Sequence, residues 1–94
     1  MIEAIYEELR TLGAVSSRTR FSEDWLGMEG SYFRGKRIAA LPQSPRALTT
    51  CAARLKGKSQ LLRQAMSPEF LRVADKLDQL ADRCVEELLA EHRG

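Results

Sequence analysis

The sequence of 94 residues predicts an all-helical domain. Apolar residues recur at spacings of three and four along most of the chain, and no sustained alternation of Val, Ile and Thr indicates a strand. Proline and glycine divide this pattern into five helical stretches, of which the last is the longest. We therefore expect one small five-helix bundle over residues 1–94, with a long C-terminal helix.

Three helices are predicted in the first half of the chain. The first runs over residues 2–12, and Gly13 is well placed to end it. A short second helix covers about residues 21–26 and is closed by a glycine. The third begins near Ser31 and must finish before Pro42, because the residue that precedes a proline is displaced from the helical region.

Two Ser-Pro pairs predict the starts of the last two helices. A serine provides an N-cap, and a proline suits the first helical position because its missing N–H is not needed there. Ser44-Pro45 opens a helix that reaches Gly57 and can continue to Ala65. Ser67-Pro68 opens the longest pattern, which extends over about residues 67–92.

The C-terminal helix carries an apolar seam in which spacings of three and four alternate. Such a seam suits packing against another helix. We predict that it is the interface of a homodimer, and the alternatives are a lid over the core and a docking surface for a partner protein. The seam consists of Phe70, Val73, Leu77, Leu80, Cys84 and Leu88.

Basic charge is concentrated in the middle of the chain. The formal net charge is only +2, but residues 1–17 carry −2, residues 18–63 carry +7 and residues 64–94 carry −3. No acidic residue occurs between Gly30 and Pro68. A polyanion would gain from this segment through phosphate neutralisation and counterion release, whereas the alternative interpretation is an ordinary solvated face.

No pattern indicates catalysis, a cofactor or a metal site. Histidine occurs once, at His92, and there is no glycine-rich phosphate loop. Cys51 and Cys84 have no Cys or His at metal-ligand spacing, and we interpret both as small buried apolar residues. Without these motifs we expect a protein that is not an enzyme. Because no apolar run reaches the length of a membrane span and the acidic start is unlike a signal peptide, we also expect it to be cytoplasmic.

Residues 16–57 carry the pattern of a helix-turn-helix, in which a glycine-containing turn separates two short helices. This segment resembles the lambda-repressor/Cro-like (Xre-type) family of small bacterial regulators. In that family a Leu-Gly pair closes the second helix, a Ser-Tyr-aliphatic triplet opens the recognition helix, and an apolar helix follows Pro-Ser. The matching motifs are Phe21-Ser-Glu-Asp-Trp-Leu-Gly-Met-Glu-Gly-Ser-Tyr-Phe-Arg34, Leu41-Pro-Gln-Ser-Pro-Arg-Ala-Leu48 and Ala52-Ala-Arg-Leu55.

The resemblance implies that Gly27 is the turn glycine and that the helix starting at Ser31 enters the major groove of double-stranded DNA. Arg34 would read bases, since arginine can donate two parallel hydrogen bonds to guanine, and Ser31 and Tyr32 would lie beside it. The other predicted contacts are to phosphates, which position a domain without reading sequence. They are Arg18, Arg20, Lys36, Arg37 and Arg46.

The predicted function is sequence-specific transcriptional regulation by a homodimer, with two copies of the third helix about one duplex turn apart. One alternative is a small adaptor or inhibitor that docks its last helix on a partner protein and its basic patch on an acidic surface. Another is a protein that coats nucleic acid without sequence preference. Because Gly35 and Lys36 depart from the family pattern, a helix-turn-helix that now binds protein also stays open.

Overall fold

Every regular element in the described residues, 2–35 and 44–93, is a helix. The computed structural model describes the side chains of these residues except 34, 35 and 91–93. The elements are α1 (Ile2–Thr11), α2 (Arg18–Arg20), the π-helical turn η1 (Phe21–Trp25), α3 (Tyr32–Gly35), α4 (Pro45–Gln64) and α5 (Pro68–Arg93). No helix in this part of the chain combines the length and the apolar composition that crossing a membrane requires.

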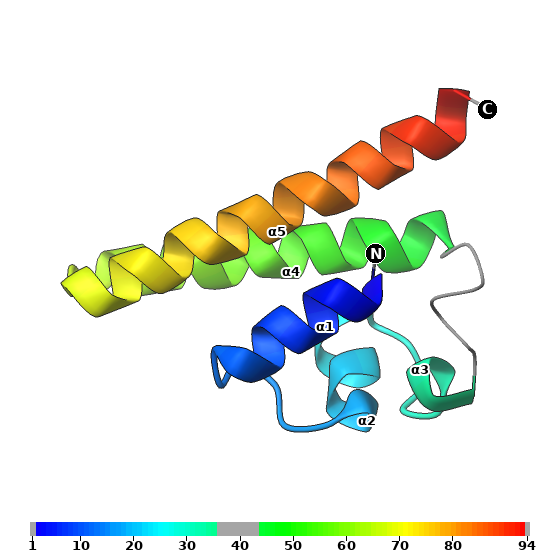
Figure 1. Cartoon of the computed structure of the whole chain (residues 1–94), viewed down its shortest axis with the longest axis horizontal. Helices are drawn as coiled ribbons and strands as arrows, with labels where there is room; N and C mark the ends of the chain where they lie inside the picture. The colour runs from blue at the N-terminus through cyan, green and yellow to red at the C-terminus, as the bar shows by residue number, and fades with distance from the viewer. Residues whose placement is uncertain (1, 36–43, 94) are drawn as a thin grey trace.

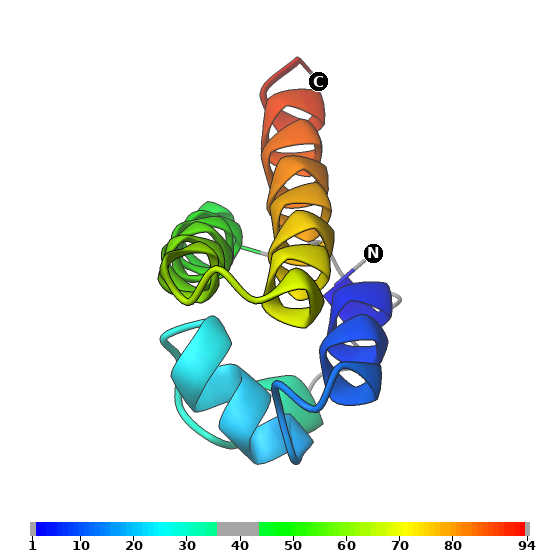
Figure 2. The ribbon, with the colours of Figure 1, turned by 90° about the vertical axis from the view of Figure 1, so that its left-hand side faces the viewer.

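The helices form two layers. The long helices α4 and α5 make an antiparallel hairpin, and the shorter elements α1, α2, η1 and α3 form the second layer beneath it (Figure 1). The view along the hairpin shows α1 under α5, with α2 and η1 under α4 (Figure 2). The N-terminal half of the chain therefore packs on one side of the hairpin.

Local signals at the two ends of α4 agree with the predicted boundaries. At its start, the Ser44 hydroxyl accepts a hydrogen bond from the Ala47 N–H at 3.1 Å, and Pro45 takes the first helical position. At its end, Met66 adopts a left-handed conformation with φ +54°, which turns the chain into α5. The predicted continuation beyond Gly57 is confirmed, because α4 runs to Gln64.

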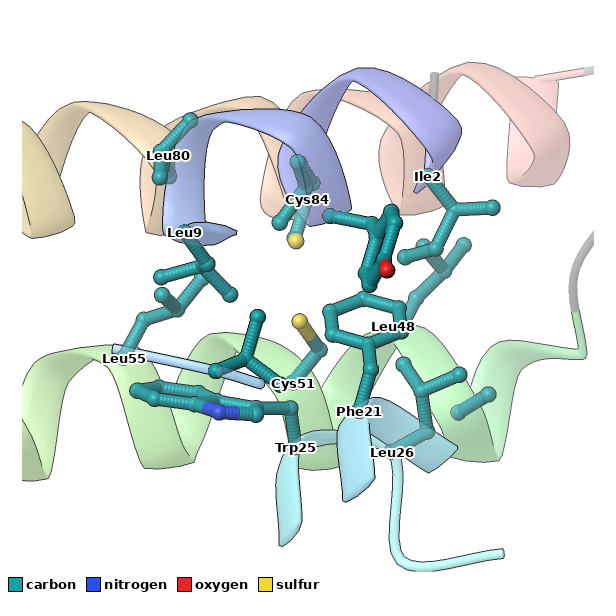
Figure 3. Packing of buried hydrophobic residues seen from close by; sticks show 14 of the residues in the cluster. Ile2, Leu9, Phe21, Trp25, Leu26, Leu48, Cys51, Leu55, Leu80 and Cys84 are labelled. Atoms are coloured by element: carbon teal, nitrogen blue, oxygen red, sulfur yellow. The ribbon is translucent and has the colours of Figure 1, made fainter. Parts of the chain in front are cut away.

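The core lies between the two layers. Apolar side chains from α4 and α5 meet those of α1 and η1, and Figure 3 shows Trp25 and Phe21 of η1 reaching up to α4. The largest fully buried side chains include Leu48 and Leu55 of α4 and Leu77 of α5. Burial of this apolar area is the dominant favourable contribution to folding, and it fixes η1 against the hairpin.

The prediction of five helices is too high by one. Four α-helices of at least one full turn occur in the described residues, namely α1, α3, α4 and α5. The predicted second helix is instead the three-residue α2, which runs into η1 because Ser22 and Leu26 bond outside the α-helical pattern. The predicted third helix is described only as α3, since residues 36–43 lie outside the described part of the chain.

The apolar seam of α5 is used mainly inside this monomer. Leu77, Leu80 and Cys84 are buried in the core, and Val73 and Leu88 are partly buried against it. Of the six residues only Phe70 is exposed, with 44% of its surface accessible. The seam was open to three interpretations from sequence, and its inner residues here form the contact between α5 and the rest of the core.

Candidate nucleic-acid interface

The candidate interface is built on α2, η1, the turn that follows them, and α3. Ser17 begins this unit, because its hydroxyl accepts a hydrogen bond from the Arg20 N–H at 3.2 Å. Ser22, which is wholly buried, connects the two short helices. Its hydroxyl donates to the Arg18 carbonyl at 3.2 Å and accepts from the Phe33 N–H at 3.0 Å. The first residues of α3 are therefore bonded directly to the preceding helix.

An aromatic cluster anchors the same unit on α1. The ring centroids of Phe21 and Phe33 are 5.0 Å apart. The ring centroid of Tyr6 lies 5.4 Å from that of Phe21 and 5.3 Å from that of Phe33. The edge-to-face and tilted arrangements are favourable for aromatic pairs. Because Phe33 is buried in this cluster, one side of α3 is fixed.

Two glycines allow the turn between η1 and α3. Gly27 has φ +66°, a left-handed conformation that glycine adopts without strain, and a Cβ there would lie 3.1 Å from the Thr50 methyl group of α4. Gly30 packs against Thr19, and a Cβ at Gly30 would come within 2.7 Å of the Thr19 methyl group. Gly27 therefore has the left-handed backbone conformation expected of a turn glycine.

Arg54 of α4 holds the end of η1. Its Nη1 donates to the carbonyl oxygens of Glu23 at 2.8 Å and Asp24 at 2.7 Å. These carbonyls lie at a helix end, where backbone acceptors need an outside partner. This role of Arg54 has no local signal in the sequence, because its partners are 30 and 31 residues away.

Arg18 makes contacts within the protein that link α2 to α1. Its guanidinium donates to the Glu3 carboxylate, with one of the two bonds at 3.1 Å, and its carbon lies 4.8 Å from the Tyr6 ring centroid and 4.7 Å from that of Phe33. The hydrogen bonds and charge of Arg18 hold the pKa of Glu3 below its ordinary value. A phosphate would have to compete with this carboxylate for Arg18.

The side chains of some other predicted contacts are described in the structure, and those of the rest are not. Arg20 and Ser31 are exposed, and Tyr32 is half-buried. Since Thr19 packs on Gly30, Arg20 and Ser31 flank the contact between α2 and the start of α3. Arg46 is exposed in the first turn of α4. Arg34 belongs to α3 but its side chain is not among those described, and Lys36 and Arg37 lie outside the described residues altogether.

The acid-free segment is not acid-free in space, because α5 places carboxylates beside it. Arg63 donates to Asp75 at 2.8 Å and to Asp78 at 2.6 Å, and Lys56 lies 3.5 Å from Asp78. Hydrogen bonding from Arg63, helped by the Lys56 charge, lowers the pKa of Asp78. Much of the charge on the second half of α4 is thus compensated by the hairpin itself.

Arg20 and Arg46 differ from these paired cations. Neither forms an ion pair with any residue that the structure describes. Figure 1 places α3 and the first turn of α4 at the same end of the long axis, opposite the turn between α4 and α5. The uncompensated cations predicted to contact phosphate therefore occur on the helix before α3 and on the helix after it.

The whole described chain falls within one recognised family. The model of a family of unknown function, DUF6626, matches residues 2–94, and the chain belongs to that family. No curated protein and no solved structure matches it.

Proposed function

We propose that the protein binds double-stranded DNA through a helix-turn-helix made of α2, η1 and α3. The observation that carries this proposal is the way α3 is held. Phe33 is buried and its N–H donates a hydrogen bond to the Ser22 hydroxyl, whereas Ser31, the residue just before the helix, is exposed. A recognition helix needs such a fixed inner side so that its opposite side can enter the major groove.

The charges around α3 support the same assignment. Arg20 and Arg46 flank α3 in sequence and are exposed without ion pairs to the described residues. Phosphate contacts on both sides of a recognition helix would set its register on the duplex. Arg46 also lies in the first turn of a 20-residue helix, where the dipole favours an anion. Exposed Glu23 and Glu29 oppose binding, so the fit must keep both away from phosphates.

We propose further that the protein recognises a specific DNA sequence and regulates transcription. Such recognition depends on Arg34 reading bases from α3, as the resemblance to the lambda-repressor/Cro-like family implies. A homodimer is proposed as well, but its contact must use residues that the monomer leaves accessible. On α5 these include Phe70, Leu71, Val85 and Leu89.

A fluorescence anisotropy titration with duplexes selected from a random pool tests this function. We expect Arg34→Ala to weaken binding to the selected duplex by about 5- to 100-fold, the range for loss of a bidentate base contact. Lys58→Ala is the matched control, because Lys58 is an exposed cation of α4 outside the proposed interface. Absence of binding at low salt, or equal losses for Arg34→Ala and Lys58→Ala, would contradict the proposal.

A second candidate function, protein binding, is favoured by a separate observation. Apolar side chains gather where α4 meets α5, with Leu61, Met66, Phe70 and Leu71 all exposed. Phe70 also lines a groove with Leu12 and Leu62. Exposed apolar surface of this kind is characteristic of interaction sites. Light scattering at increasing protein concentration would show whether a second copy covers it, and Leu61→Ser together with Phe70→Ser should then return the protein to a monomer.

A further inference from the structure

Cys51 and Cys84 face each other in the core between α4 and α5. Figure 3 shows the two sulfur atoms directed toward one another from opposite helices. Both side chains are free thiols with none of their surface accessible. They are the two cysteines of the whole sequence. The antiparallel hairpin therefore brings together two cysteines that are 33 residues apart in the sequence.

The surroundings of the pair leave each thiol few other partners. Phe21 lies beside the two sulfur atoms in Figure 3, and Leu48, Leu55 and Leu80 belong to the same buried apolar cluster. The hydrogen bond from Cys51 lowers the pKa of Cys84, while the same bond and burial raise the pKa of Cys51. Cys84 is therefore assigned as the attacking thiol and Cys51 as its partner.

We propose that Cys51 and Cys84 form an intrachain disulfide when the protein meets a small peroxide oxidant, covalently joining α4 to α5. The Cys84 sulfur attacks one oxygen of hydrogen peroxide, the O–O bond breaks, and Cys84 becomes a sulfenic acid with release of water. The Cys51 sulfur then attacks the Cys84 sulfur, the S–O bond breaks, and a second water leaves with the Cys51 proton. Two thiols lose two electrons to one peroxide. This inference does not rest on DNA binding.

Burial determines the rate of this reaction and the selectivity for small oxidants. Because neither sulfur is accessible, the oxidant must arrive during a local separation of α4 from α5. A bulky alkylating reagent should therefore react slowly with the native protein, and quickly once it is unfolded. Once α4 and α5 close again, the facing sulfur atoms favour the second step over further oxidation of Cys84, because Cys51 is directed at it.

The disulfide would also stabilise the fold. It closes a loop from Cys51 to Cys84 that includes the turn between α4 and α5. Such a cross-link restricts the unfolded chain, and for a loop of this length in a domain of this size the expected rise in Tm is about 10 °C or more. The reduced and oxidised proteins can be compared without any substitution, which keeps the test independent of folding defects in variants.

The test is intact-mass spectrometry of the full chain after treatment with hydrogen peroxide, followed by unfolding and alkylation of the remaining thiols. We expect a monomer that has lost about 2 Da, the mass of two hydrogens, that no longer accepts alkyl groups and that regains both thiols on reduction. A sample of the oxidised protein that has not been alkylated should show the rise in Tm of about 10 °C or more. In Cys51→Ala, Cys84 should instead retain oxygen and react with a sulfenic-acid reagent.

Three results would overturn the inference. Two thiols still alkylated after peroxide treatment would show that the pair does not oxidise. A disulfide-linked dimer would show that the sulfur atoms meet other chains first. A wild-type monomer that gains oxygen on one cysteine without losing the other thiol would show that the second step does not occur.

Discussion

The two layers of this protein are held together by different means. The hairpin of α4 and α5 combines an apolar seam with ion pairs that join Lys56 and Arg63 to the carboxylates of α5. The layer of α1 to α3 has shorter helices, and to its aromatic cluster it adds single polar contacts from Ser22 and from Arg54 of α4. The comparison teaches that cations are compensated where acidic α5 packs along α4, whereas Arg20 and Arg46, which lie away from that contact, form no ion pair with the described residues.

The largest expected effect concerns the seam of the hairpin. Leu77→Ala should lower the free energy of unfolding by about 3–4 kcal/mol, because Leu77 is wholly buried and the substitution leaves a cavity. Leu89→Ala on the same helix is the matched control, with an expected change of less than about 1 kcal/mol because Leu89 is 53% exposed. Urea denaturation measures both. Equal losses would mean that α5 packs its outer side as tightly as its inner one.

A second substitution tests the polar contacts of the other layer. Ser22→Ala removes the acceptor of the buried Phe33 N–H, and an unsatisfied buried donor costs about 1–3 kcal/mol. Ser31→Ala changes an exposed hydroxyl nearby and should alter stability by less than about 0.5 kcal/mol. The same denaturation experiment compares them. If Ser22→Ala is as harmless as Ser31→Ala, α3 is not held in the way described.

Two glycines should respond to alanine with opposite signs. Gly27→Ala strains a backbone with φ +66° and crowds Thr50, so we expect a loss of about 1–2 kcal/mol. Gly57→Ala lies inside α4 with open space around the new methyl group, and should raise stability by about 0.5–1 kcal/mol through helix propensity. Thermal melts distinguish the two, and a gain for Gly27→Ala would remove the argument for a glycine-dependent turn.

The smallest effect is the dependence of stability on pH. Glu3 and Asp78 have pKa values lowered from 4.5 and 3.8 by their arginine partners. A carboxyl whose pKa is depressed by folding contributes stability above its ordinary pKa and loses it as the pH falls through the depressed value. Stability should therefore be level above about pH 5 and decline below pH 4. Asp78→Asn should flatten part of that decline, and an unchanged profile would contradict the Arg63–Asp78 contribution.

Helix boundaries could be predicted from sequence because their signals are local. Ser44-Pro45, Gly13 and the regular spacing of α5 each specify a start, an end or a buried side within a few residues. These features hold in the structure because no distant contact opposes them. The all-helical class and the long C-terminal helix follow from the same signals.

The candidate site could be predicted only in part, because its remaining contacts join residues far apart in the chain. The motif around Gly27 identified the turn, but nothing near Arg18 reveals that it pairs with Glu3, and nothing near Arg54 reveals that it caps η1. The basic segment was likewise counted without the carboxylates of α5, which approach it only when the hairpin forms. Charge along a sequence therefore overstated the charge available to a partner.

The central claim is that uncompensated cations flanking α3 form a phosphate-binding surface. Its most direct test is the salt dependence of duplex binding for Arg20→Ala with Arg46→Ala, compared with Lys58→Ala. We predict that the double substitution lowers the slope of log affinity against log salt by about 2, since each phosphate contact contributes about 0.9, while Lys58→Ala leaves the slope unchanged. Identical slopes for all three proteins, or a loss confined to Lys58→Ala, would contradict the claim.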